Sequence, residues 1–217
     1  GVMVALPEHG AFGHRLKEAV TKIVPIVEGR FVFHETLSFP LAPMIGVIGV
    51  TPADNEIPTG EIGDHGGNMD ATVIRKGARL YFRVQTDGAL LALGDAHAGM
   101  GDGEALICGV EATAKVTLKC DLLKAQDFTP QRPVVEFDGM YAAIAHGDTL
   151  DSAAAKALDD MADLLRAKSA MSEAEAAMLI SAVGNLRVCQ IVDPQKTARV
   201  EMPKSALGLR AEDRLFG

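Results

Sequence analysis

The residues best suited to chemistry lie at positions 94–111, GDAHAGMGDGEALICGVE. Asp95, His97, Asp102 and Glu104 stand within its first eleven positions, among four glycines. Glycine leaves the backbone free to turn and lets a ligand approach closely. An imidazole and carboxylates on such a segment are the donor types that bind a divalent metal. The pattern therefore predicts a metal or catalytic site.

A second acidic and polar cluster lies upstream at positions 64–70, DHGGNMD. It adds His65, Asn68 and Asp70 to the groups that could hold a cation or touch a substrate. If the two clusters fold side by side, they supply one site from two loops. Stretches rich in glycine and aspartate are also typical of plain turns, and for either cluster taken alone that interpretation stays open.

Composition and charge narrow the class of protein. The chain has 217 residues, with 29 acidic against 21 basic side chains and a net charge of −8. That charge disfavours nucleic acid and anionic membranes as partners. Its three cysteines are scattered and odd in number, which indicates a reducing compartment. No long apolar span and no signal peptide is visible. We therefore expect a cytoplasmic protein.

The elements that must position these clusters can be read from hydrophobic periodicity. Hydrophobic residues make up 48% of the chain, which supports a real core. Alternating and β-branched runs predict strands at 30–36, 44–50, 71–74, 79–84, 90–93, 106–118, 134–137, 186–192 and 200–203. Helical spacing predicts helices at 12–26, 150–167 and 172–183, the last opened by a Ser172–Glu175 capping box.

This order of elements predicts an α+β protein that is mostly β, with two helices in its C-terminal half. We expect residues 1–140 to form a β-rich region that carries the site loops. Residues 141–217 are expected to form an α+β region of two helices and a buried strand that packs on it. The site loops then follow strands, where a sheet can hold catalytic groups rigidly.

Three motifs occur in order along the chain: GVIGVTP at 46–52, GGNMD at 66–70 and GDAHAGMGDGE at 94–104, with a further acid at Glu111. In type, order and spacing they resemble the acetamidase/formamidase family. The resemblance implies hydrolysis of short aliphatic amides, such as formamide or acetamide, to a carboxylate and ammonia. It also implies a largely β fold of sandwich-like or barrel-like form and a bound divalent metal.

On this interpretation the candidate site residues take distinct roles. The expected metal ligands are His97, Asp70 and Asp95, with Asp102 and His65 as further candidates. The expected catalytic residues are Glu104, Glu111 and Asn68: either glutamate could act as general base, and Asn68 could hydrogen-bond the substrate amide. Zinc suits histidine with carboxylates, whereas calcium or magnesium would suit an all-oxygen set, so the metal stays open among these three.

Two alternatives stay open at this point. The first is a non-catalytic β domain that binds a metal or a small ligand. The second is a hydrolase of a different amide, because Met100 stands where the family often has glutamine. The region before position 46 is shorter than in most family members, so a fragment, a trimmed form or a divergent short member are all open. Uncovered sheet edges would favour a homo-oligomer, such as a homodimer.

Overall fold

A five-stranded antiparallel sheet forms the framework of the molecule. The structure is a computed structural model and describes residues 1–124 and 128–216. The strands are paired in the order β13 (Asn185–Gln190), β14 (Lys196–Pro203), β12 (Met140–Gly147), β11 (Val134–Phe137) and β9 (Arg79–Tyr81). Six consecutive residues of β14 are buried, so both faces of the sheet are covered.

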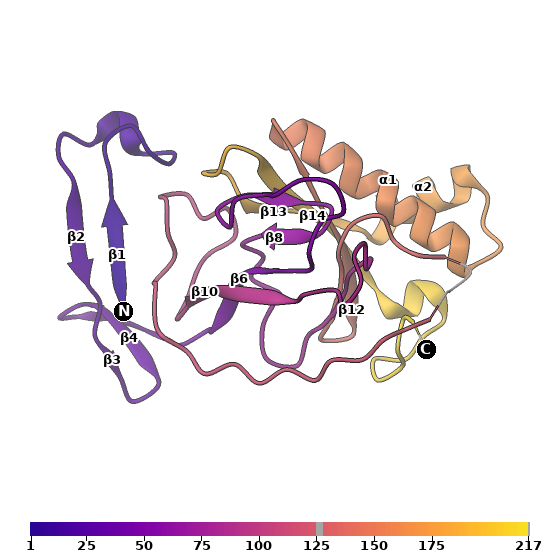
Figure 1. The fold of residues 1–217 in the computed structure, drawn as a ribbon, viewed down its shortest axis with the longest axis horizontal. Helices are drawn as coiled ribbons and strands as arrows, with labels where there is room; N and C mark the ends of the chain where they lie inside the picture. Colours follow the sequence, from indigo (N-terminus) through magenta and orange to yellow (C-terminus); the bar gives the residue numbers. More distant parts are fainter. Residues whose placement is uncertain (125–127, 217) are drawn as a thin grey trace.

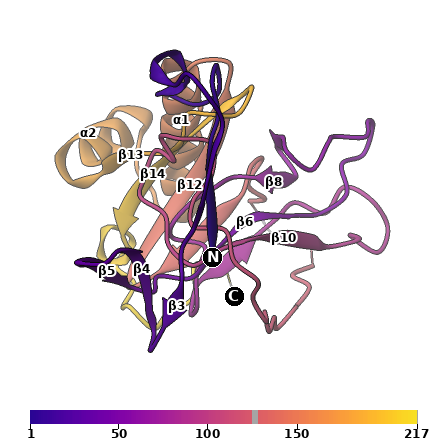
Figure 2. The same ribbon diagram turned by 90° about the vertical axis from the view of Figure 1, so that its left-hand side faces the viewer.

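Side chains along β12 alternate between two cores, because successive residues of a strand point to opposite faces of its sheet. Tyr141 and Ala143 belong to a hydrophobic cluster on the helix side of the sheet. Ala142 and Ile144 belong to a second cluster on the other side. The helices on the first face are α1 (Leu150–Lys168) and α2 (Glu173–Val183), as Figures 1 and 2 show.

The two helices expected in the C-terminal half are confirmed to within a residue at each end. The Thr149 side chain caps α1 by accepting the Ser152 N–H. The expected capping box opens α2, where Ser172 and Glu175 each satisfy the other's backbone N–H. No helix within the described parts of the chain has the length and apolar character to span a membrane.

A smaller antiparallel sheet packs against the second face and carries both sequence clusters. Its strands are paired in the order β10 (Ala92–His97), β6 (Met44–Gly49), β8 (Gly66–Asn68) and β7 (Ile62–Gly63). Ile48, Met69 and Val73 fill the space between the two sheets together with Ile144 from β12. The mostly β fold with two C-terminal helices is thereby confirmed, whereas the division near residue 140 stays a prediction.

The N-terminal segment differs from its sequence prediction. The expected helix at 12–26 is wrong: Gly13–Arg15 form a single 3₁₀ turn, η1, and Val20–Ile23 form strand β2. The apolar spacing fitted a helix, but the β-branched residues of β2 pair with β1 (Val2–Ala5) instead. This pairing satisfies the backbone of both segments, and it overrides the weaker helical pattern.

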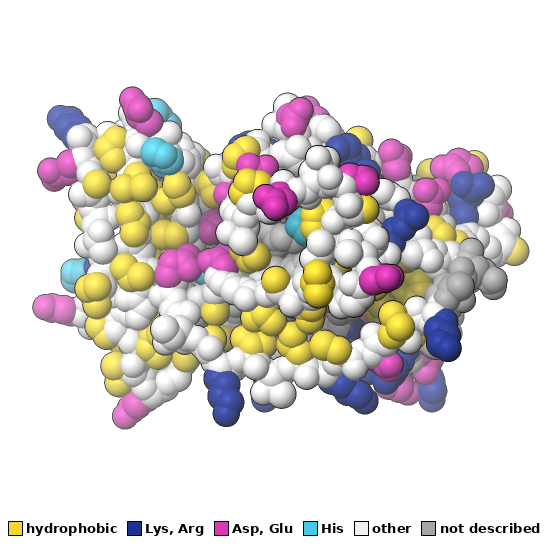
Figure 3. All heavy atoms as spheres, viewed as in Figure 1, with side chains coloured by type: hydrophobic (Ala, Val, Ile, Leu, Met, Phe, Trp, Pro, Cys, Tyr) yellow, Lys and Arg dark blue, Asp and Glu magenta, His cyan; other side chains and the backbone are white. Residues whose placement is uncertain are grey.

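A three-stranded sheet follows, with β3 (Ile26–Val27), β4 (Arg30–His34) and β5 (Leu37–Pro40). Together with β1 and β2 it lies at the opposite end of the molecule from the helices (Figure 1). Hydrophobic side chains gather on the surface of this end (Figure 3), where Ile23 and Val27 are exposed.

Two further strand predictions are wrong. Residues 71–74 contain no strand, and the expected strand at 106–118 is irregular chain with bends at 106, 107 and 109, which makes only isolated bridges, through Glu111. Gly109 before Glu111 and the alanines after it give this segment little side-chain surface to pack, so it pairs locally rather than as a ladder. The strand expected at 90–93 runs further than predicted, as β10, to His97.

A buried ion pair attaches the 3₁₀ turn near the end of the chain to the five-stranded sheet. Lys204, at the start of the 3₁₀ turn η2 (Lys204–Leu207), pairs with Glu136 of β11. Their side chains are 4% and 2% exposed. Glu136 also accepts hydrogen bonds from the Tyr81 hydroxyl and the Leu215 N–H. Burial raises the pKa of the Glu136 carboxyl, but these partners outweigh burial and hold the pKa below its ordinary value.

We predict that Glu136 stabilises the fold in a pH-dependent way. Because its folded-state pKa is lowered, its contribution is present above the ordinary pKa of 4.5 and is lost as the pH falls through the lowered value. Glu136→Gln should lower the free energy of unfolding by about 3 kcal/mol at neutral pH and flatten its acid dependence. Urea unfolding over a pH series measures both. The exposed Glu212→Gln serves as control, and equal acid dependence in the two variants would contradict the prediction.

Candidate active site

Strand β10 presents Asp95 and His97 toward the same side, because they stand two residues apart. The backbone of Asp95 is left-handed, with φ +56°, and Asp95 has no partner in the ladder with β6. The carboxylate Oδ1 of Asp95 lies 3.2 Å from Nε2 of His97. The sequence placed these residues on a loop, whereas the structure places them on the edge strand of a sheet.

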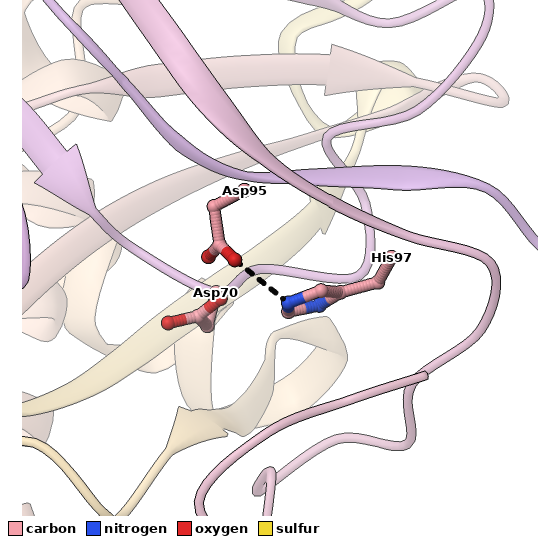
Figure 4. Close-up of side chains that lie close together, drawn as sticks. All are labelled: Asp70, Asp95 and His97. Carbon is pink, nitrogen blue, oxygen red and sulfur yellow. Dashed lines mark hydrogen bonds and ion pairs between the residues drawn. The ribbon is translucent and has the colours of Figure 1, made fainter. Parts of the chain in front are cut away.

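Asp70 reaches the same space from the segment after β8. It is 1% exposed and also left-handed, with φ +44°. One ligand atom from each of Asp70, Asp95 and His97 lies within 4.8 Å of the others. Figure 4 shows the three side chains directed at one another. The two sequence clusters therefore converge, as predicted.

Two glutamates complete a second group around the same imidazole. Ligand atoms of His97, Glu104 and Glu111 also lie within 4.8 Å of one another. An isolated antiparallel bridge sets Glu111 opposite His97, and Oε1 of Glu111 lies 2.9 Å from His97 Nε2. Glu104 is 7% exposed and has φ +39°. His97 thus belongs to both groups.

The crowding of acidic groups changes their protonation. Burial, together with the neighbouring Glu104 and Asp95 carboxylates, raises the pKa of Asp70 to about 9. Burial likewise raises the pKa of Glu104 to about 7. Burial opposes the charged form of His97, but hydrogen bonds to Asp95 and Glu111 outweigh it and raise the His97 pKa to about 10. The site holds excess negative charge that only protons or a cation can balance.

Several polar atoms in the site have no protein partner. Oδ1 of Asp70 and Oε2 of Glu104 are fully buried without a hydrogen bond. Such atoms are costly unless a ligand or ion satisfies them. Gly46 of β6 lets the carboxylates of Asp95 and Asp70 approach the backbone closely, because a Cβ there would collide with both of them. The donor atoms fit a small cation.

The groups open into a pocket of about 500 Å³. Its wall is acidic where the two groups lie, and apolar where Val47, Leu93 and Ile107 line it. Asn68 also lines it, and its Nδ2 donates to Oδ2 of Asp193 at 2.8 Å. An acidic region beside an apolar wall can place a small polar molecule with a short hydrocarbon part.

Asp193 is a pocket residue that the sequence analysis missed. It follows β13, and burial raises its pKa to about 6. No glycine-rich motif surrounds it. The available signal was its position just after a strand, where functional side chains are often held.

Two candidate ligands lie outside both groups. The carboxylate of Asp102 faces Arg199 and Thr72. His65 is buried between β7 and β8 of the same sheet, where a Cβ at Gly63 or Gly67 would crowd its ring. The structure therefore brings together Asp70, Asp95, His97, Glu104 and Glu111, with Asn68 nearby, but neither Asp102 nor His65.

Comparisons with known proteins agree with this architecture. A sequence profile of the Acetamidase/Formamidase family matches residues 51–207. An acetamidase from Bacillus halodurans has a crystal structure that aligns with a TM-score of 0.92 and 46% identity, covering 96% of this chain and 71% of that one. A predicted acetamidase/formamidase from Thermoanaerobacter tengcongensis aligns with a TM-score of 0.93 and 43% identity, covering 95% and 68%.

A formamidase from Methylophilus methylotrophus is 42% identical over 62 residues. That match spans 28% of this chain and only 15% of the formamidase. The profile, in contrast, covers more than half of the chain, and the structural matches cover nearly all of it. The resemblance inferred from the motifs is thereby confirmed: the chain belongs to the acetamidase/formamidase family.

Proposed function

We propose that this protein hydrolyses short aliphatic amides, such as formamide or acetamide, to a carboxylate and ammonia with the help of a divalent metal. The observation that carries the proposal is the convergence of two motifs on His97 beside a pocket. The names of the similar proteins, formamidase and acetamidase, support the substrate class. A cytoplasmic location and a homo-oligomeric state stay predictions.

Asp70, Asp95 and His97 are the proposed metal ligands. Their donor set of one nitrogen and several carboxylate oxygens suits zinc better than calcium, which takes six to eight oxygens, or magnesium. The proposed ligands leave unpartnered donor atoms, such as Oδ1 of Asp70, where a cation would satisfy them. A divalent cation bound there would acidify water and polarise a carbonyl group.

Glu104 is the proposed general base. Burial raises its pKa to about 7 in the absence of a cation, so this carboxyl can hold a proton as well as release one, as a group that must both accept and return a proton requires. It would take a proton from the attacking water and deliver it to the amide nitrogen as the C–N bond breaks. Glu111 pairs with the same His97 nitrogen as Asp95, Nε2, and we propose that it keeps the ring oriented.

Asn68 is the proposed substrate contact. Asp193 accepts from its Nδ2 and so fixes the plane of the amide group at the pocket wall. The apolar residues Val47, Leu93 and Ile107 would contact the acyl chain. Water released from these apolar atoms would favour binding of an acetyl over a formyl group by about 1 kcal/mol.

Metal removal tests the proposal as a whole. We expect ammonia release from formamide or acetamide to stop with a chelator and to return with one metal, which would identify the ion. Metal content is measured in parallel. Release from metal-free protein would contradict the metal requirement. Intact, metal-loaded protein that releases no ammonia from either amide would contradict the proposed substrates and leave a binding domain or another amide.

Single substitutions should separate binding from proton transfer. His97→Ala should abolish metal content and turnover together, because the ring belongs to both groups. Glu104→Gln should keep the metal and lower kcat by about 10²–10⁴-fold. Glu173→Gln, on the exposed start of α2, is the control. A His97→Ala variant with full metal and full turnover would overturn the assignment.

A paired glycine test probes the placement of the Asp70 and Asp95 carboxylates. Gly46→Ala should weaken Zn²⁺ binding roughly tenfold or more, because its methyl group would collide with the Asp95 and Asp70 carboxylates. Gly94→Ala is the matched control, since a Cβ on this neighbouring strand meets nothing within 4 Å. Calorimetric titration measures both affinities. Equal Zn²⁺ affinity in the two variants would show that Zn²⁺ binding does not depend on the placement of these two carboxylates.

A further inference from the structure

The structure points to a positioning role for Asp102 and Arg199: we propose that this ion pair holds Glu104 and Asp70 at the spacing that the cation and the substrate require. The inference rests on the proposed function and deepens it. It assigns to Asp102 a role different from the one expected from its sequence, where it was a candidate ligand.

Arg199 and Asp102 form a bidentate ion pair. Nη1 of Arg199 lies 3.0 Å from Oδ1 of Asp102, and Nη2 lies 2.8 Å from Oδ2. The Arg199 side chain, on β14, is only 3% exposed, and its Nε donates to Glu201 at 2.7 Å. A planar guanidinium held in this way fixes the carboxylate in both position and orientation.

The loop that carries Asp102 is also fixed through its backbone. The Gly103 N–H donates to the Cys189 carbonyl at 2.8 Å, and the Ile191 N–H donates to the Gly103 carbonyl at 3.1 Å. These bonds join the loop to the end of β13. Glu104 is the next residue, so its place in the site follows directly from where Asp102 and Gly103 are held.

Asp102 also reaches the other motif. Its Oδ1 accepts a hydrogen bond of 2.7 Å from the hydroxyl of Thr72, two residues after Asp70. One carboxylate therefore contacts both the segment of Glu104 and the segment of Asp70. Its two oxygens are already engaged by Arg199 and Thr72, which leaves Asp102 poorly placed to act as a ligand itself.

The site requires an ion pair that holds its loops in place, because it brings buried acids close together. Asp70 and Glu104 are buried acids that interact with each other, and they repel each other whenever both are ionised. Neither stands in regular secondary structure that would resist this force. The Asp102–Arg199 pair supplies the resistance from the five-stranded sheet, whose position does not depend on the charge in the pocket.

The test compares Arg199→Lys and Asp102→Asn with the matched control Arg187→Lys. Arg187 stands on β13 and pairs with the same Glu201 at 3.7 Å, but no hydrogen bond joins it to Asp102. Zn²⁺ affinity, kcat, KM and thermal stability are measured on the full chain. Both test variants should lose about 10–100-fold in Zn²⁺ affinity or kcat, as second-layer residues of metal sites do, while the control changes little.

Two additional measurements test the inference if the Arg199→Lys and Asp102→Asn variants fold poorly. Thr72→Val removes a single hydrogen bond from a half-buried side chain and should weaken Zn²⁺ binding severalfold. Guanidinium ion added to Arg199→Ala should restore part of the lost affinity, which a general loss of stability would not allow. Folded variants with wild-type Zn²⁺ affinity, kcat and KM would overturn the inference.

Hydrogen exchange separates this inference from the proposed function. Without the pair, the amides of residues 101–104 should exchange faster while those of β12 stay protected. This readout requires neither metal nor turnover. Faster exchange in a protein that binds no Zn²⁺ and releases no ammonia would refute the proposed function and retain the loop attachment. Unchanged exchange in Asp102→Asn would refute the attachment itself.

Discussion

The candidate site depends on the close packing of buried acids around one imidazole. Asp70 and Glu104 are almost inaccessible to solvent, and each contributes to the other's protonation state. Carboxylates are brought this close only where a fold can resist their separation or where a positive group compensates them. Among the described residues, the His97 ring is the group that both acidic clusters share. The arrangement is costly for an empty fold and well suited to one that holds a cation.

The packing of the two sheets against each other resists separation of these buried acids. The five-stranded sheet is packed on both faces, so its strands have little freedom to shift. The smaller sheet lies against it and carries two of the proposed ligands, Asp95 and His97, on its edge strand, β10. Edge strands leave one side of the backbone unpaired, and the bridge between His97 and Glu111 uses that free side to bring a second acid into the site. The rigid five-stranded sheet thus supports the smaller sheet, whose edge is open to a ligand.

Local sequence patterns identify many residues of the candidate site. They identify few of the residues that hold that site in place. His97 and Asp70 could be predicted because glycine-rich acidic motifs are visible within a few residues. The roles of Asp102 and Asp193 could not, since they depend on Arg199 and Asn68, which are distant in sequence. The N-terminal helix was predicted wrongly for a related reason: Val20–Ile23 find their partner in β1, and a pairing between segments leaves no periodic signal within either. The predicted fold class is correct despite these errors, because the helices and the long strands of the core have strong local patterns.

The left-handed backbone of Asp70, Asp95 and Glu104 has an evolutionary consequence. Residues with a Cβ adopt this conformation at a cost, which glycine does not bear. Replacement of these acids by glycine would therefore relieve backbone strain, and replacement by either glycine or asparagine would remove the repulsion between ionised carboxylates. Loss of the chemistry at these positions would tend to make the fold more stable rather than less. A duplicated copy of such a gene, freed from selection for activity, could drift into an inert and durable descendant without passing through an unfolded form.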